Sequence, residues 1–410
     1  MYIKRHLANV IERTRKTFPS VLVTGPRQVG KTTLLKATVG SEAEFFTLDD
    51  FHTLEHIKQD PMGFLQDHKP PIIIDEVQYA PDVFRAIKLE IDKTIPNRKN
   101  GQYFMTGSQA YRLMKGVSES LAGRVAINEL YGLSNREIDG DGFCEPFLPT
   151  AEYFENRNTK IDSDFSKIWQ RIHRGSMPEV VSNPDVDWHD FYSEYFKTYI
   201  ERDVRDLSQV GDQLSFMQFV KALAARTGEL LSKASLAKDL GISEPTIKKW
   251  LSVLEASHII CLLQPFSLNA KSRIIKMPKV YFFDTGLVCY LCKWNTPESL
   301  RDGAQAGNIF ETFVVNEIIK SYANAGKEIR IYFYRDTNQK EIDMVFWVDG
   351  TLHPIEIKKT ATPKKSDIHQ FQTLKTAFPN MKIGTGGLIC TYEKLSSLDE
   401  NNKIIPLNYI

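Results

Sequence analysis

Apolar and polar positions follow a strand–helix rhythm along the first part of the chain. Short apolar runs end in polar or glycine-containing tips, as in "SVLVTG", "PPIIIDEVQ" and "QYFMTGSQ". Segments with helical spacing, such as "TLLKAT", lie between them. Strands that alternate with helices are typical of a parallel sheet covered by helices. The pattern therefore predicts an α/β fold with a parallel sheet up to about residue 130.

The pattern changes after this predicted sheet. Residues 131–215 are helical and rich in aromatic side chains, and residues 216–268 have the spacing of a winged helix-turn-helix. From residue 269 to 410, runs of strand character accompany one long helical segment. A chain of 410 residues is too long for one hydrophobic core. We therefore expect four regions: 1–130, 131–215, 216–268 and 269–410.

Composition narrows the class of protein without indicating a substrate. The chain is 42% hydrophobic and 25% charged with a net charge of +1, which is ordinary for a globular protein. Its front is acidic and its rear mildly basic, which weakly favours a polyanion partner for the C-terminal half. The N-terminus lacks the apolar core of a signal peptide, and no run reaches the ~20 apolar residues of a membrane span. We expect a cytoplasmic protein with no membrane partner.

The segment "GPRQVGKTT" matches the phosphate-binding pattern G-x-x-x-x-G-K-[ST] between a strand and a helix. Gly25 and Gly30 let the backbone curl so that N–H groups face phosphate oxygens, and the next helix adds its positive end. Lys31 can reach the β- and γ-phosphates, and the Thr32 hydroxyl can bind Mg²⁺. The residues predicted to bind ATP·Mg²⁺ are Gly25, Pro26, Arg27, Gln28, Val29, Gly30, Lys31, Thr32 and Thr33.

Two later strands end in polar residues that suit ATP hydrolysis. Asp75 could hold Mg²⁺ through water, and Glu76 could polarise the attacking water. Thr106 or Ser108 could sense the γ-phosphate, or could hold a turn by hydroxyl–backbone bonds. Arg124 could contact phosphate in its own chain or in a neighbouring subunit, or could form a surface salt bridge. Together with the phosphate-binding loop, these residues predict hydrolysis rather than binding alone.

The helix-turn-helix pattern lies in "KASLAKDLGISEPTIKKWLSVLEASHIICLL". Gly241 ends the first helix, and Ser243 caps the second. On the exposed face of the second helix, Lys248 and Lys249 could contact phosphate, while Thr246 could reach a base edge. Winged helices also serve as packing modules between domains, so DNA contact and structural packing both stay open.

A pair of carboxylates is predicted on one face of a C-terminal hairpin, in "EIDMVFWVDGTLHPIEIKKT". Asp349-Gly350 reads as a two-residue turn, which places Asp343 directly opposite Glu356. Opposite residues have Cβ atoms about 5 Å apart, so two like charges there are favourable when they share a divalent cation. We predict a metal site at Asp343 and Glu356.

Two further residues complete this predicted centre. Lys358 points to the same face as Glu356 and could stabilise an attacking hydroxide or the developing phosphoryl charge. Glu311 lies in the helical segment "GNIFETFVVNEII", whose spacing could turn it inward. The alternative is an ordinary ion pair between Lys358 and Glu341 across the hairpin.

Nearly end to end, the chain resembles a widespread prokaryotic family of AAA-type ATPases with a C-terminal domain of unknown function. The motifs "GPRQVGKTT", "IIIDEVQ", "FMTGSQ" and "SLAGRV" match its ATPase core, and "GSMPEV", "YIERDV", "VYFFDTGL" and "GNIFETFVVNEI" match its later parts. The last domain looks like the PD-(D/E)XK nuclease fold, and Glu311, Asp343, Glu356 and Lys358 fall on the active-site pattern of that fold. The resemblance implies an AAA-type P-loop sheet, a helical lid, a winged helix and a restriction-endonuclease-like domain with Mg²⁺.

The same resemblance suggests assembly and function. AAA-type relatives often form rings in which an arginine of one subunit completes the next site, so we expect a homo-oligomer, with a ring as one form. Arg124 and Arg202 are the candidate arginines. The leading hypothesis is an ATP-hydrolysing protein that acts on nucleic acid, DNA favoured over RNA, and cleaves it with Mg²⁺. The alternative is a regulatory ATPase switch whose winged helix and inactive nuclease fold only bind nucleic acid or a protein.

Overall fold

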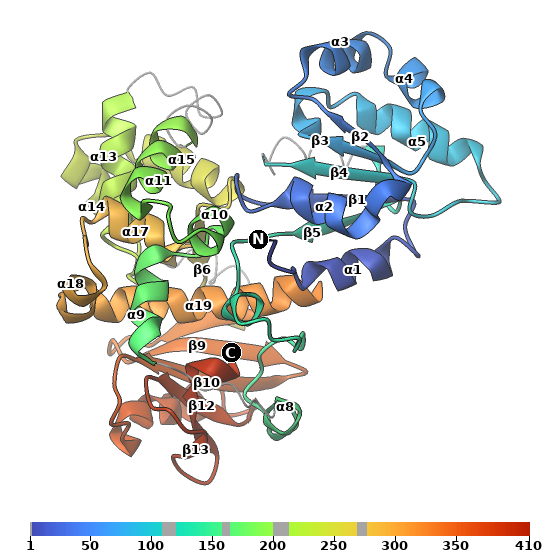
Figure 1. Cartoon of the computed structure of the whole chain (residues 1–410). Coiled ribbons are helices and arrows are strands. Elements are labelled where there is room, and N and C mark those ends of the chain that lie inside the picture. The colour runs from blue at the N-terminus through green and yellow to red at the C-terminus, as the bar shows by residue number, and fades with distance from the viewer. Residues whose placement is uncertain (1, 109–119, 158–164, 200–212, 269–276) are drawn as a thin grey trace. The chain divides into compact units, whose positions relative to one another are not determined.

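In the computed structural model, residues 2–108, 120–157, 165–199, 213–268 and 277–410 are described (Figure 1). The chain divides into two compact units. The first comprises Met1–Leu133, Ala256–His258 and Ala323–Lys327, and the second comprises Ser134–Glu255, Ile259–Tyr322 and Glu328–Ile410. The four sequence regions are therefore not four compact units, and their standing as separate domains stays a prediction.

The first unit is built on the predicted parallel sheet. Its strands are β1 (Ser20–Thr24), β2 (Glu44–Thr47), β3 (Ile72–Asp75), β4 (Tyr103–Gly107) and β5 (Val125–Glu129). They lie in the order β2-β3-β4-β1-β5, and each neighbouring pair is parallel. The helices are α1 (Leu7–Thr14), α2 (Lys31–Val39), α3 (Phe51–Gln59), α4 (Pro61–Asp67) and α5 (Val83–Lys93), with short 3₁₀ turns at Gly40–Glu42 and Val77–Tyr79.

Strands β1, β3 and β4 are buried along their whole length, which explains their continuous apolar sequences. Strand β1 lies between β4 and β5 and leads directly into the phosphate-binding loop. Because parallel strands end at the same edge of a sheet, the polar tips of β1, β3 and β4 come together there. The topology thus gathers the predicted nucleotide-binding residues from three separate segments.

Most of the helices that the structure describes lie in the second unit. They are α7 (Asn135–Ile138), α8 (Ala151–Asn156), α9 (Phe165–Arg174), α10 (Pro178–Ser182), α11 (Trp188–Tyr195), α13 (Gln213–Ala224), α14 (Lys233–Leu240), α15 (Glu244–Ala256), α17 (Thr285–Leu291), α18 (Pro297–Asp302), α19 (Ala306–Ala325) and α20 (Gln372–Ala377). Two 3₁₀ turns lie at Lys365–Phe371 and Leu407–Tyr409. The last residues of α15 and α19 belong to the first unit.

The two helices of the predicted helix-turn-helix are α14 and α15. Gly241 follows α14 with a φ of 68°, a left-handed conformation that glycine adopts without steric cost. The hydroxyl of Ser243 accepts from the backbone N–H of Thr246 at 3.2 Å, as predicted for the N-terminal cap of α15. Strands β6 (Ile260–Leu263) and β7 (Lys279–Phe282) then pair antiparallel.

The C-terminal part of the second unit is a mixed sheet of seven strands. Its strands are β8 (Ile331–Arg335), β9 (Glu341–Val348), β10 (Thr351–Lys358), β11 (Lys382–Ile383), β12 (Gly386–Cys390), β13 (Ser396–Ser397) and β14 (Asn402–Pro406). The order is β13-β14-β12-β10-β9-β8, with β11 paired to β10. In Figure 1, α19 runs along this sheet, and Tyr322 of α19 stacks on Phe346 of β9 at a centroid distance of 6.3 Å.

The hairpin of β9 and β10 has the predicted register. Thr351 pairs with Val348, and the pairing continues to Ile355 opposite Met344. The turn residues Asp349 and Gly350 have φ values of 48° and 75°, as a two-residue turn with both central residues left-handed requires. The turn and these pairs are as predicted; one residue further on, the backbone N–H of Ile357 donates to Asp343, so Asp343 lies beside the strand segment that contains Glu356.

Candidate functional site

The phosphate-binding loop takes a backbone path that only glycine permits at its first position. Gly25 has a φ of 145°, and a Cβ atom there would lie 2.0 Å from the carbonyl oxygen of Leu130. Gln28 and Gly30 also have positive φ values, of 63° and 87°. The loop therefore curls between β1 and α2 as the sequence motif predicts.

Lys31 is held inside this loop. Its side chain is 5% exposed, and Nζ donates to the carbonyl oxygens of Gly25 at 3.1 Å and Pro26 at 2.7 Å. Burial lowers the pKa of Lys31 to about 8, against the opposing charges of Glu76 and Asp75. The ammonium is thus bound only to neutral carbonyl groups, which leaves its charge available to a polyphosphate.

Arg5 supports the loop from outside, and sequence reasoning missed it. The side chain is 3% exposed, and its two terminal nitrogens donate to the carbonyl oxygens of Val29 at 2.8 Å and Tyr131 at 2.7 Å. These contacts join the loop to the chain that follows β5. Arg5 lies in a run of basic residues at the N-terminus, so nothing in the sequence separates it from a solvated arginine.

Asp75 lies at the centre of a hydroxyl–carboxylate network. The Thr32 hydroxyl donates to Oδ1 of Asp75 at 2.6 Å, and the Thr106 hydroxyl donates to the same oxygen. The two predicted Mg²⁺-binding residues, Thr32 and Asp75, are therefore in direct contact. Hydroxyl and carboxylate oxygens are the hard ligands that Mg²⁺ prefers, so this donor set fits the ion.

Glu76 is oriented by its neighbours. Its backbone has a φ of 57°, and its N–H donates to the Thr106 hydroxyl at 3.1 Å. The Ser108 hydroxyl donates to Oε2 of Glu76 at 3.2 Å, and the Gln78 amide donates to the same oxygen. Thr106 and Ser108 thus hold the two acidic residues, and Gln78 is a further positioning group that the sequence did not single out.

Arg124 forms an ion pair within the first unit. Its Nε and Nη2 donate to the two carboxylate oxygens of Asp92 at 2.7 Å and 3.1 Å. This pair is the salt-bridge alternative that the sequence left open, and a phosphate contact by Arg124 stays a prediction. The other candidate arginine, Arg202, lies outside the described residues.

His258 is a second residue near the loop that sequence reasoning missed. It belongs to the first unit, is 8% exposed, and its Nε2 is buried without a hydrogen-bond partner. Its ring meets that of Tyr131 edge to face at 5.6 Å. Burial lowers the pKa of His258, with Glu129 opposing and Lys31 reinforcing the shift. The imidazole therefore lies within electrostatic range of Lys31.

The predicted C-terminal centre has its carboxylates where the hairpin places them. One oxygen of Asp343 accepts from the backbone N–H of Ile357 at 2.9 Å. Glu356 is 6% exposed, its Oε1 accepts from Lys358 at 2.9 Å, and its Oε2 is buried without a partner. Burial, and then the charge of Asp343, raise the pKa of Glu356 to about 8. Lys358 is thus bound to Glu356.

This contact corrects one alternative drawn from the sequence. Glu341 does not pair with Lys358, because its carboxylate contacts Lys279 at 2.6 Å and Arg335 at 3.0 Å. The cross-strand ion pair expected between Glu341 and Lys358 is therefore wrong. The reason is that Lys279, from β7, reaches the face of the hairpin and attracts the carboxylate more directly.

Lys279 connects three acidic groups of the centre. Its Nζ lies 2.6 Å from Glu341, 2.9 Å from Glu311 and 3.5 Å from Asp343. The Tyr281 hydroxyl donates to the same Glu311 oxygen at 2.6 Å. Glu311 does turn inward from α19, as predicted, and burial followed by the charge of Asp343 raises its pKa to about 7.

The C-terminal donor set does not fit a divalent cation as arranged. Within the described residues, no group of three or more His, Cys, Asp and Glu side chains is placed to hold a metal ion. The ammonium of Lys279 lies among the carboxylates instead, and it contacts Asp343, one of the two predicted metal ligands. A strand lysine in "MPKVYFF" gives no sequence signal of this kind.

The part of the chain that contains the nucleotide site matches a known family. Residues 17–139 match the family model described as AAA domain. This segment contains the phosphate-binding loop, Asp75 at the end of β3 and Glu76 directly after it. The chain carries an AAA-type ATPase domain. Residues 166–298 and 306–410 match two further models, each described as a domain of unknown function.

Proteins similar to this chain occur in Mycobacterium and Haemophilus. An uncharacterized protein of Mycobacterium tuberculosis is 27% identical over 411 residues, covering 99% of this chain and 84% of that protein. An uncharacterized protein of Haemophilus influenzae is 22% identical, covering 73% of this chain and 74% of that protein. Among solved structures, the Walker-type ATPase of Pyrococcus abyssi aligns at 14% identity with a TM-score of 0.46, covering 71% of this chain and 96% of that one.

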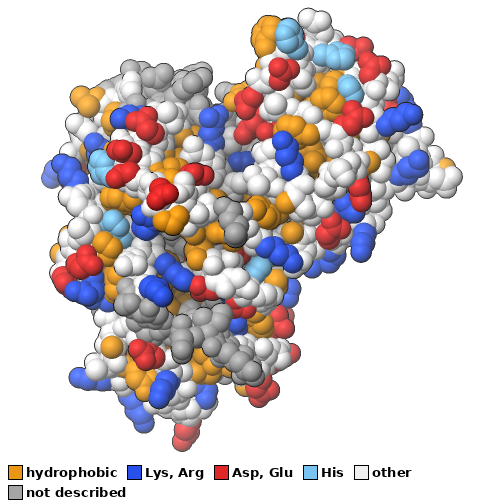
Figure 2. Space-filling model, in the orientation of Figure 1, with side chains coloured by type: hydrophobic (Ala, Val, Ile, Leu, Met, Phe, Trp, Pro, Cys, Tyr) orange, Lys and Arg blue, Asp and Glu red, His pale blue; other side chains and the backbone are white. Residues whose placement is uncertain are grey.

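Outside the AAA-type ATPase domain, the predicted nucleic-acid-binding residues lie on α15. Lys248 and Lys249 are exposed, while Thr246 is half-buried and its hydroxyl lies 2.8 Å from that of Ser243. On the face drawn in Figure 2, basic and acidic side chains are interspersed. Any electrostatic attraction to a polyanion is therefore local rather than spread over this face.

No helix of the described residues has the length and apolar character needed to cross a membrane.

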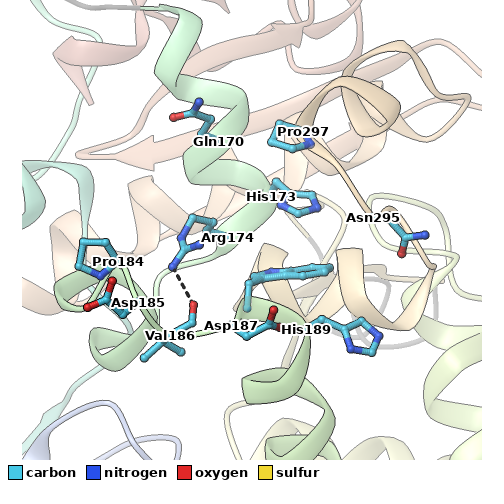
Figure 3. Close-up of a pocket in the computed structure, with 11 residues that line it drawn as sticks. Gln170, His173, Arg174, Pro184, Asp185, Val186, Asp187, His189, Asn295 and Pro297 are labelled. Atoms are coloured by element: carbon cyan, nitrogen blue, oxygen red, sulfur yellow. Dashed lines mark hydrogen bonds between the residues drawn. The ribbon is translucent and has the colours of Figure 1, made fainter.

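A polar cavity of about 780 Å³ lies in the second unit (Figure 3). None of the residues predicted from the sequence contributes to it. His173 stacks on Trp188 at 4.3 Å and hydrogen bonds to the carbonyl oxygen of Trp294, and Arg174 donates to the carbonyl oxygen of Val186 at 3.4 Å. His173 and Arg174 thus have partners within the protein, whereas Nε1 of Trp188, which also lines the cavity, is buried without a hydrogen-bond partner.

Proposed function

We propose that this chain binds and hydrolyses ATP·Mg²⁺ and that ATP turnover regulates its engagement of nucleic acid. The proposal that the chain hydrolyses ATP rests on one observation, the hydrogen bonds from the Thr32 and Thr106 hydroxyls to one oxygen of Asp75. Side chains from α2, β3 and β4 meet at a single carboxylate, directly beside the phosphate-binding loop. This arrangement supports a role in holding Mg²⁺ next to the phosphates, because hydroxyl and carboxylate oxygens are the ligands that the ion prefers.

Each residue has a separate task in this proposal. Lys31 leaves its loop carbonyls to bind the β- and γ-phosphates, and Thr32 and Asp75 hold Mg²⁺, which supplies charge stabilisation to the phosphates. Glu76 accepts a proton from the attacking water, while Gln78 and Ser108 keep its carboxylate oriented. Thr106 fixes the spacing of the two acidic residues by bonding to both.

The nucleic-acid half of the proposal rests on α14 and α15. Two helices joined by a tight turn and followed by the antiparallel pair β6–β7 have the order of a winged helix. Lys248 and Lys249 would contact backbone phosphates, and Thr246 a base edge of double-stranded DNA. The helix α15 also ends at Ala256, which belongs to the first unit, and His258 follows two residues later. The chain thus gives a short covalent path between the two sites.

Replacement of both α15 lysines tests the nucleic-acid half. Lys248→Ala with Lys249→Ala should weaken binding of labelled double-stranded DNA and reduce the slope of log affinity against log salt by up to about 1.8, because each phosphate contact contributes about 0.9. A matched control replaces Lys58 and Lys99, which are exposed on the first unit. Unchanged affinity and slope in the α15 variant, relative to this control, would assign α15 to packing.

Cleavage of the nucleic acid is the second candidate function, and one observation favours it. Asp343, Glu356 and Lys358 lie together on the hairpin, and Glu356 carries a buried oxygen without a partner. The position of Lys279 favours the regulatory alternative, in which the chain holds nucleic acid without cutting it. Incubation of labelled DNA and RNA with Mg²⁺ decides between them. Cleavage that Asp343→Ala abolishes would establish a nuclease, and intact substrate beside active ATP hydrolysis would support the switch.

A further inference from the structure

The positive charge of Lys279 is surrounded by the negative charges of three carboxylates. The residue is 3% exposed on β7, and the carboxylates that surround it come from α19 and β9. A lysine ammonium has three N–H donors, and three carboxylates lie within 3.5 Å of Nζ. Burial of an ion costs free energy unless the ion is paired and hydrogen-bonded. Here the ammonium supplies positive charge and N–H donors, and the carboxylates supply negative charge and acceptor oxygens.

A divalent cation would bind these same oxygen atoms. Carboxylates drawn together from separate elements are stable only when a positive charge lies among them, and a hard cation or an ammonium can each supply that charge. Both cannot occupy the space, because Nζ already lies at hydrogen-bond distance from Glu341 and Glu311. The Tyr281 hydroxyl adds a further donor to Glu311, which reduces its capacity to bind a metal.

We propose that the ammonium of Lys279 is the resident cation of the C-terminal centre and takes the place of a divalent metal. The centre then organises β7, α19 and β9 without binding metal in the native protein. Removal of the Lys279 charge leaves Glu311, Glu341 and Asp343 as an oxygen-rich site that recruits a divalent cation. The inference deepens the regulatory form of the proposed function, but it concerns metal binding and does not depend on nucleic acid.

The experiment uses Mn²⁺ alone as the probe, followed by the loss of its free electron paramagnetic resonance signal. All proteins are full-length and nucleotide-free, and all carry Thr32→Ala to remove the Mg²⁺ ligand of the ATPase domain. The parent should take up no Mn²⁺ at the C-terminal centre, and Lys279→Met should take up one equivalent. Lys279→Arg is the matched control, because it keeps the positive charge and should take up none.

Two results would overturn the inference. One is uptake of one equivalent by the parent that disappears with Asp343→Asn, which would show that metal displaces Lys279 in the native chain. The other is a folded Lys279→Met protein, with native circular dichroism, that takes up no Mn²⁺. If Lys279→Met folds only when Mn²⁺ is present, the inference is supported; if it does not fold at all, uptake by the parent alone decides.

Discussion

Lys31 and Lys279 are both buried, but their pKa values shift in opposite directions. Lys31 donates to two neutral carbonyl groups of its own loop, and burial lowers its pKa to about 8. Burial alone would also lower the pKa of Lys279, but Tyr281 and then the surrounding carboxylates raise it well above its usual value. A lysine whose charge is uncompensated attracts an anion, whereas a compensated one holds its surroundings together. We therefore expect Lys31 to bind a ligand and Lys279 to stabilise the elements around it.

The lowered pKa of Lys31 predicts how ATP binding depends on pH. In the free protein, Lys31 loses its positive charge as pH rises through its pKa of about 8, although a lysine in water keeps its charge up to its ordinary pKa of 10.5. A neutral amine attracts the polyphosphate less, so ATP affinity should fall above that pH. Titration with a fluorescent ATP analogue from neutral pH to about pH 9.5 measures it. Adenosine, which has no phosphate, is the control, and an ATP affinity that stays constant over this range contradicts the assignment.

Removal of the Lys31 side chain tests the residue more severely. Lys31→Ala should lower ATP turnover by about a hundredfold or more, since it removes the charge that stabilises the transferring phosphoryl group. Steady-state phosphate release measures the loss. Lys58→Ala, on the exposed face of α3, should retain turnover. Turnover by a clean preparation of Lys31→Ala at the wild-type rate would mean that the loop is not the catalytic site.

At the scale of elements, the sequence predicts those features that depend only on neighbouring residues in the chain, such as loops and turns. The phosphate-binding loop follows from its glycines, and the β9–β10 register follows from Asp349-Gly350, because a two-residue turn fixes every later pair. Arg5 and Lys279 could not be predicted in the same way. Their partners lie on other elements, and a single basic residue in an apolar or helical run has no pattern that reveals what the fold will bring to it.

Gly25 shows how strictly one element fixes another. Gly25→Ala would place a Cβ atom 2.0 Å from the Leu130 carbonyl oxygen, so β1 and the chain after β5 must separate. We expect a loss of at least about 2 kcal/mol in unfolding free energy, with loss of ATP binding. Gly123→Ala is the control, because Gly123 also has a positive φ, of 72°, but open space around it. Equal effects of the two substitutions on thermal unfolding would rule out the clash.

At the scale of the whole molecule, the chain joins an AAA-type ATPase domain to a second unit that matches two domains of unknown function. Segments 256–258 and 323–327 belong to the first unit, although the chain on either side of each lies in the second. The chain therefore enters the first unit again after α15 and at the end of α19. In the proposed function, these two returns of the chain are the covalent path by which the nucleotide state would act on α15.

The most direct test of the central claim is the affinity of the full-length chain for labelled double-stranded DNA in the presence of ATP, of ADP and of no nucleotide. We predict that affinity differs between the ATP and ADP states by about fivefold or more, as expected for coupled sites. Lys31→Ala should show one affinity in all three conditions. Wild-type affinity that is the same in every nucleotide state, or absence of DNA binding in all of them, would contradict the account.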